Sequence, residues 1–126
     1  MNREARERGR RSAAVRAAAC ERIIAAIDDI ETVIRGQTQA DFFAEDFDAR
    51  TRRKACELDV VRIANDVAEA GIEDDLPTLA RDGLRKQRSI AAHSYVAMDP
   101  DMLWRGLHGL DEVKRAAEAA LRALGA

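Results

Sequence analysis

Apolar residues recur every three or four positions along most of the chain, the spacing that places side chains on one face of a helix. The first such stretch is typical of a core-facing helix that begins at about Ser12, a favourable N-cap, and stops at Gly36. Residues 1–11 carry arginines and no apolar stripe, so they are expected to be a frayed basic N-terminus. The apolar positions of this first helix are Cys20, Ile23, Ile24, Ile27, Ile30 and Ile34.

Two further helical segments follow. The segment QTQADFFAEDF contains all three phenylalanines and predicts a short extra helical turn that packs over the core. Asp48 is then expected to cap a second long helix, which Gly71 ends. The apolar stripe of this second helix is Cys56, Val60, Ile63, Ala64 and Val67.

An acidic loop, EDD at 73–75, separates the second helix from a third, for which Pro77 suits the first position and which is expected to run to about Met98. Asp99 and Pro100 form the next N-cap signal. A fourth helix then follows as one continuous element. Its apolar positions are Leu103, Leu107, Leu110, Ala117, Leu121 and Leu124.

No segment alternates with a period of two, so strands are not expected. Long helices joined by short loops predict an all-α fold, an up-and-down four-helix bundle with a short extra helical turn between helices 1 and 2. The 126 residues suffice for one domain with its own core. We therefore expect a single helical domain spanning residues 1–126.

Composition narrows the possible functions. There are 21 basic and 23 acidic residues, giving a net charge of -2, so any contact with nucleic acid must come from a local patch. Aromatic residues make up only 4%, which argues against a single-strand binder built on base stacking. Cys20 and Cys56 lack metal-ligand spacing and are expected to be buried thiols. Without a membrane span or secretory signal, a cytoplasmic protein is expected.

The stretch RSIAAHSY, residues 88–95, concentrates unusual chemistry on the third helix. Arg81, Arg85, Arg88 and Tyr95 fall on one stripe, whereas His93 lies about 140° away from Arg88 on an ideal helix. Joint action of arginine and histidine therefore requires the long reach of arginine, a second copy of the helix, or both. The alternative is an ordinary solvated arginine face with a hydrogen-bonded histidine.

The third helix resembles the RX4HXY signature of the HepT family: Arg88 is followed after four residues by His93 and after one more by Tyr95. Asp99 and Trp104, which follow, add to the likeness. HepT proteins belong to the HEPN superfamily of small helical ribonucleases, and the likeness covers nearly the whole chain. It implies a HEPN-type bundle and a metal-independent RNA endonuclease without a cofactor. The active site would lie in the cleft of a homodimer, and the protein would be the toxin of a type II toxin–antitoxin system.

The resemblance also implies roles for individual residues. Arg88 and His93 would be catalytic, and Ser89, where relatives commonly have Asn, would give polar support. Tyr95 would be the residue to which an MNT-type nucleotidyltransferase antitoxin attaches AMP to silence the toxin. DVVRIA in the second helix departs from the EIIGEA-like pattern of relatives. Because Arg85 stands in a GLR context like the stretch before the motif, it remains an alternative to Arg88.

These residue types suit RNA cleavage. The 2′-hydroxyl is an internal nucleophile, histidine can act as base or acid near neutral pH, and arginine can hold two phosphate oxygens. Arg81, Arg85 and Lys86 are candidates for binding RNA phosphates. The cluster RTRRK at 50–54 is better explained as a solvated face. Side chains assigned to packing, or given no catalytic role, are Phe42, Phe43, Trp104 and His108.

Two other classes of function remain open. In one, the chain is a non-catalytic HEPN-type module that binds a nucleotidyltransferase or a nucleotide and uses the arginine stripe only for docking. In the other, it is a structural helical adaptor, and Tyr95 stays unmodified whatever the partner. A non-catalytic module predicts partner binding that survives His93→Ala, with no cleavage of RNA.

Overall fold

The computed structural model describes the backbone of residues 3–93 and 100–125 and the side chains of residues 12–88 and 101–125. Regular structure in these ranges is entirely helical, which confirms the predicted all-α class. The short turn predicted between the first two long helices is present as α2. The elements are α1 (Arg3–Ile34), α2 (Gln39–Phe42), α3 (Phe47–Ala70), the 3-10 turn η1 (Glu73–Asp75), α4 (Thr78–His93), α5 (Pro100–Leu107) and α6 (Asp111–Ala123).

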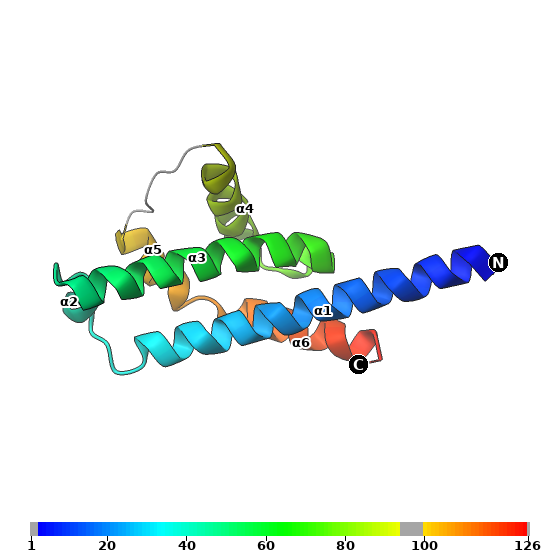
Figure 1. The fold of residues 1–126 in the computed structure, drawn as a ribbon, viewed down its shortest axis with the longest axis horizontal. Coiled ribbons are helices and arrows are strands. Elements are labelled where there is room, and N and C mark those ends of the chain that lie inside the picture. Colours follow the sequence, from blue (N-terminus) through cyan, green and yellow to red (C-terminus); the bar gives the residue numbers. More distant parts are fainter. Residues whose placement is uncertain (1–2, 94–99, 126) are drawn as a thin grey trace.

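The first helix is longer than the apolar pattern predicts. It begins at Arg3 rather than at about Ser12, and its N-terminal part projects beyond the other helices in Figure 1. Arginine, glutamate and alanine are strong helix formers, so this segment continues the helix without an apolar stripe of its own. The predicted stop is correct, because Gly36 follows the helix with a positive φ of 75°.

Aspartate and threonine side chains organise the connection between α1 and α3. Thr38 caps α2 through a reciprocal capping box with Asp41, and Phe42 of this short helix is buried. Helix α3 has Asp46 as its N-cap, so the assignment of the cap to Asp48 is wrong by two residues. Asp48 lies instead in the first turn, where its carboxylate interacts favourably with the helix dipole.

The predicted fourth helix is two helices. Residues 100–124 do not form one element, because the chain breaks after Leu107 and resumes helix at Asp111. Gly106 and Gly109 stand at the break, where the Gly109 N–H donates to the Gly106 carbonyl at 3.1 Å in a tight turn. Glycine has low helix propensity, so the helix ends here although the helical spacing of apolar residues continues across the break.

The third predicted helix is α4. The Pro77 carbonyl accepts a hydrogen bond from the Arg81 N–H at 2.9 Å, so Pro77 precedes the helix and Thr78 is its first residue. Within the described residues the helix extends to His93. The remainder of its predicted span, 94–98, and the predicted N-cap Asp99 lie outside them.

Helices α1 and α3 run antiparallel and side by side, with α6 along α1, while α4 leaves this layer at a steep angle and packs chiefly against α3 (Figure 1). One apolar cluster joins the helices. Polar ties reinforce it: Arg22 of α1 bridges Asp66 at 3.0 Å and Glu69 at 3.1 Å on α3. The largest fully buried side chains include Phe42, Ile23, Ile27, Ile30, Ile63 and Ile72.

Both cysteines belong to this core. Cys20 on α1 and Cys56 on α3 are buried and free, as the apolar patterns predict. Burial raises the pKa of both thiols, that of Cys56 to about 11, because a thiolate is poorly solvated there. Within the residues that the structure describes, no three histidine, cysteine or carboxylate side chains form a ligand set for a metal ion.

Gly71 ends α3 in the left-handed conformation, with φ at 70°, whereas Gly83 lies inside α4 with nothing within 4 Å of an added Cβ. Gly71→Ala is expected to lower the free energy of unfolding by about 1 kcal/mol. Gly83→Ala, the matched control, is expected to raise it by about 0.5–1 kcal/mol because alanine favours helix. Urea unfolding followed by circular dichroism measures both, and equal effects would contradict the assigned backbone conformations.

The cysteines supply a second check. With a pKa of about 11, only about one thousandth of Cys56 is thiolate at about pH 8, and a disulfide reagent reacts with thiolates. Both thiols are expected to react slowly in the native protein and fully in guanidinium chloride. Rapid native labelling of Cys56 at about pH 8, measured by mass spectrometry after digestion, would show that its site is open to solvent.

Candidate functional site

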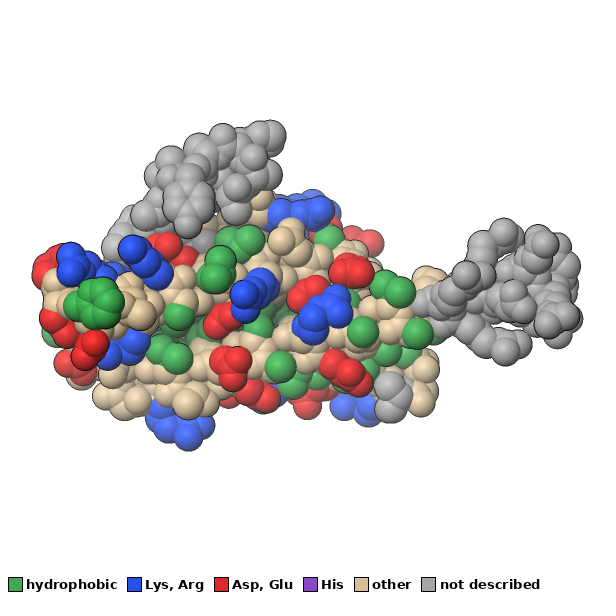
Figure 2. All heavy atoms as spheres, viewed as in Figure 1, with side chains coloured by type: hydrophobic (Ala, Val, Ile, Leu, Met, Phe, Trp, Pro, Cys, Tyr) green, Lys and Arg blue, Asp and Glu red, His purple; other side chains and the backbone are tan. Residues whose placement is uncertain are grey.

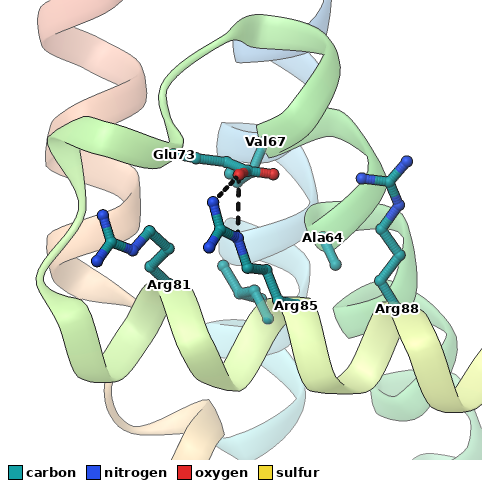
Figure 3. Close-up of a pocket in the computed structure, with 7 residues that line it drawn as sticks. Ala64, Val67, Glu73, Arg81, Arg85 and Arg88 are labelled. Atoms are coloured by element: carbon teal, nitrogen blue, oxygen red, sulfur yellow. Dashed lines mark hydrogen bonds and ion pairs between the residues drawn. The ribbon is translucent and has the colours of Figure 1, made fainter.

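Three arginines project from one side of α4, toward α3 and the turn η1 (Figure 3). We call Arg81, Arg85 and Arg88 the arginine face. Their separations of four and three residues return to nearly the same angle on a helix, so the sequence periodicity places them together. Figure 2 shows basic and acidic side chains interspersed over one view of the molecule, in keeping with the small net charge.

The arginine face lies above a small apolar floor. Ala64 and Val67 of α3 and Leu84 of α4 line a small recess of about 10 Å³, together with Glu73 and the three arginines. A space of this volume holds about one water molecule. The recess is therefore no pocket for a small organic ligand, and any anion must bind at its rim, through the guanidinium groups.

Arg85 is already engaged within the chain. Its Nη2 and Nε donate to the same carboxylate oxygen of Glu73, at 2.8 and 3.2 Å (Figure 3). The hydrogen bond and charge of Glu73 raise the pKa of Arg85 further, so this guanidinium stays protonated. Glu73 comes from the acidic loop, which thus faces the arginine face directly.

Arg81 is held less tightly. Its nearest carboxylate oxygens belong to Asp74 at 3.7 Å and to Asp82 at 3.9 Å, beyond ordinary hydrogen-bond distance. The buried Nε of Arg81 has no hydrogen-bond partner among the residues that the structure describes. Buried donors are normally satisfied, so this N–H retains capacity for an acceptor.

Arg88 is exposed, and it forms no ion pair or hydrogen bond with any residue whose side chain the structure describes. Figure 3 shows its side chain rising beside Ala64, apart from the pair formed by Arg85 and Glu73. Of the two arginines considered for the catalytic role, Arg88 is thus the one whose guanidinium is not committed to Glu73.

Lys86 does not share this arrangement. It follows Arg85 by one residue, about 100° around the helix, and does not line the recess under the arginines. The structure therefore brings Arg81 and Arg85 together with Arg88, and it leaves Lys86 on another side of α4.

Ser89 and His93 of the motif are located only by the backbone. Ser89 and His93 lie within α4, with side chains outside the described set, and Tyr95 lies outside the described residues. Because one helix spans both positions, His93 is about 140° from Arg88 around the axis. A single copy of α4 thus does not present the two residues on one face.

The second basic cluster, RTRRK at 50–54, is partly structural. Nη1 of Arg53 donates to the backbone carbonyls of Phe42 and Ala44 at 2.6 and 2.7 Å, which secures the connector to α3. The cluster was expected to be a solvated face, yet Arg53 is half-buried. Sequence gave no sign of this role, because its acceptors are backbone atoms.

The aromatic residues assigned to packing do pack. Phe42 lies 5.0 Å from Trp104 and 5.8 Å from Phe43 between ring centroids, and the cluster adjoins the core. The ring of His108 lies 4.3 Å from that of Trp104, and its Nδ1 is 2.8 Å from the Trp104 carbonyl. His108 lies at the helix break and does not line the recess under the arginine face.

A larger concave surface, between α4 and the pair α5 and α6, is not evident from the sequence. Its volume is about 770 Å³, and its rim includes Leu79, 88% exposed, and Met102, 41% exposed. The spacing of apolar residues does not predict this groove, because it predicts one straight helix in place of α5 and α6. Apolar side chains that line this groove include Val60, Ala80, Leu84, Leu103, Leu110 and Val113.

Within the described ranges, no helix combines the length and the apolar character needed to cross a membrane. No protein-family model matches the chain, and neither a curated protein nor a solved structure matches it.

Proposed function

We propose that the chain is a metal-independent RNA endonuclease in which Arg88 and His93 of a HEPN-type homodimer form the catalytic site. The observation that carries the proposal is the arginine face, where an uncommitted Arg88 stands five residues before His93 on the same helix. Guanidinium groups that converge on one face match the bidentate geometry of phosphate.

The chemistry needs only groups that the chain supplies. The RNA 2′-oxygen attacks the neighbouring phosphorus while the bond from phosphorus to the 5′-oxygen breaks. One histidine accepts the 2′-hydroxyl proton, and a second donates a proton to the departing 5′-oxygen. Arg88 stabilises the extra negative charge of the phosphorane, and the products are a 2′,3′-cyclic phosphate and a 5′-hydroxyl.

A homodimer answers two requirements of this chemistry. Each chain contributes one motif histidine, whereas the reaction uses an acid and a base. The angle between Arg88 and His93 also separates them on one helix, so Arg88 of one copy would act with His93 of the other across a two-fold axis. Support comes from the packing of α4, which lies chiefly on α3 and has exposed Leu79 near its start.

Binding of substrate would use the rest of the arginine face. Arg81 and Arg85 contact backbone phosphates, and such contacts carry little sequence information and weaken with salt. The acidic net charge of -2 disfavours binding elsewhere on the surface. The RNA strand would therefore be drawn to α4.

The biological setting that we propose follows the RX4HXY resemblance. The protein would be a cytoplasmic type II toxin, and its antitoxin an MNT-type nucleotidyltransferase that attaches AMP to Tyr95. The physical reason is direct: an added phosphate and nucleoside two residues from His93 would repel and block incoming RNA phosphate.

A second candidate function draws on the apolar groove beside α4. Its volume of about 770 Å³ and exposed apolar rim suit a helix of a protein partner. In this alternative the chain is a non-catalytic module that docks a nucleotidyltransferase. The two functions differ in one result: only the first requires cleavage of RNA by the unmodified protein.

The catalytic assignment predicts that purified, unmodified protein cleaves single-stranded RNA in EDTA. Arg88→Ala is expected to lower the rate by about 10²–10³-fold and His93→Ala by about 10²–10⁴-fold. Gel analysis of a labelled RNA gives the rates, and phosphatase and kinase treatment of the fragments identifies the cyclic phosphate.

Arg122→Ala is the matched control for this experiment, because it removes an arginine from the last turn of α6, which packs along α1. Its rate should equal that of the parent protein. Intact RNA with every substrate, or equal loss in all three variants, would refute the ribonuclease assignment and favour the docking module.

The AMPylation assignment predicts that an MNT-type nucleotidyltransferase and ATP add AMP to the protein at Tyr95 and abolish cleavage. Tyr95→Phe should block the addition and leave cleavage by the folded protein within about threefold, because the hydroxyl is given no part in the reaction. Intact-mass and peptide mass spectrometry locate the adduct. Addition at another residue, or retained cleavage after complete addition at Tyr95, would contradict this mode of silencing.

A further inference from the structure

The acidic turn η1 lies against the arginine face in a way that the proposed ribonuclease site does not require. Glu73 places one carboxylate oxygen on two donors of Arg85, at 2.8 and 3.2 Å, and Asp74 approaches Arg81 at 3.7 Å. A phosphate oxygen would use the same two donors of Arg85. The Glu73 carboxylate therefore occupies the position of a ligand.

We propose that Glu73 is an internal competitor for RNA phosphate, which holds Arg85 in the free protein and releases it when a phosphate group takes its place. The inference rests on the proposed function, since it names how access to the same face is regulated. It assigns Arg85 to reversible phosphate binding and leaves Arg88 as the arginine available from the start.

The backbone of η1 is fixed, so the exchange would involve the Glu73 side chain. Ile72 before the turn and Leu76 after it are both buried in the core. Within the turn, the Asp75 N–H donates to the Ile72 carbonyl at 3.0 Å and the Leu76 N–H to the Glu73 carbonyl at 3.2 Å. Two buried anchors and two hydrogen bonds hold Glu73 opposite Arg85.

The strength of the pair suits exchange. The side chain of Arg85 is 56% exposed and that of Glu73 is 27% exposed, and ion pairs at such exposure are weak because water screens them. A phosphodiester group in a strand also brings neighbouring phosphates to Arg81 and Arg88, which a single carboxylate does not. A polyanion thus displaces Glu73, whereas an isolated anion competes poorly.

This competition has a measurable signature in salt. Binding of a strand to the parent protein exchanges one internal pair for one phosphate contact at Arg85. When Glu73 is replaced by a neutral residue, Arg85 is unpaired in the free protein. Its contact with a phosphate then increases the net number of counterions that are released on binding. For single-stranded RNA, each added contact steepens the dependence of log affinity on log salt by about 0.7.

The test measures binding of a fluorescein-labelled 2′-O-methyl oligouridylate, which lacks the nucleophile and so stays intact, by fluorescence anisotropy over a series of KCl concentrations. Glu73→Gln is expected to tighten binding by roughly three- to tenfold at low salt and to steepen the salt slope by about 0.7. Asp75→Asn removes the same charge from the same turn, where the structure gives Asp75 no ion pair with a described residue, and should change affinity by less than about twofold.

Arg85→Ala alone and combined with Glu73→Gln completes the design. If Glu73 acts through Arg85, the double variant shows none of the gain that Glu73→Gln gives in the parent background. A gain that persists without Arg85, or one matched by Asp75→Asn, would overturn the competitor role. Circular dichroism melts confirm that each variant is folded.

Arg88→Ala separates this inference from the proposed function. Loss of binding in Arg88→Ala, with no effect of Glu73→Gln, keeps the RNA-binding face and rejects the competitor. If neither Arg88→Ala nor Arg85→Ala changes binding, the RNA does not bind at the arginine face, and both the proposed function and the competitor role of Glu73 are rejected. If neither the parent protein nor Glu73→Gln binds the oligonucleotide, both proposals are rejected.

Discussion

The packing of the isoleucine stripe of α1 against α3 is the contact on which the rest of the fold depends. Ile23, Ile27 and Ile30 are fully buried, and α6 packs along the same helix. Each fully buried isoleucine stabilises the fold by about 1.5–3 kcal/mol relative to exposure. Partly exposed ion pairs such as Arg22 with Asp66 contribute less, because water screens them. Because α1 and α3 form the central pair, α4 is positioned by α3 and keeps another side open.

That position of α4 explains the electrostatics of the candidate site. Helix α3 ends at Gly71, and the short connection through η1 returns the chain so that its acidic residues meet the arginines of the next helix. Charged residues of two separate elements, Glu73 of η1 and Arg85 of α4, thus become neighbours in space. The net charge of -2 conceals this, since Arg85 is neutralised by Glu73 while Arg88 has no described partner. Local pairing, not total charge, decides which cations are free to bind phosphate.

Several arginines of this chain donate hydrogen bonds to backbone carbonyls or carboxylates of the protein and not to solvent alone. Nε of Arg16 donates to the carbonyl of Ala70 at 2.9 Å, where it satisfies an acceptor at the end of α3. Arg53 holds the connector through two carbonyls at 2.6 and 2.7 Å. An arginine count therefore overstates the basic surface available to a nucleic acid. On α4, Arg81 and Arg88 retain donors that no acceptor among the described residues satisfies.

The sequence by itself determined the helical class, the buried stripes, the stop at Gly71 and the shared angle of the arginines on α4. These features follow from residue spacing within one helix, which is local. It did not determine the break between α5 and α6, the groove that the break creates, or the pairing of Arg85 with Glu73. Glycine propensity at Gly106 and Gly109 competes with a continuous apolar pattern, and only packing decides between them. Contacts between separate elements depend on how helices cross, so the tertiary structure alone placed Glu73 on Arg85.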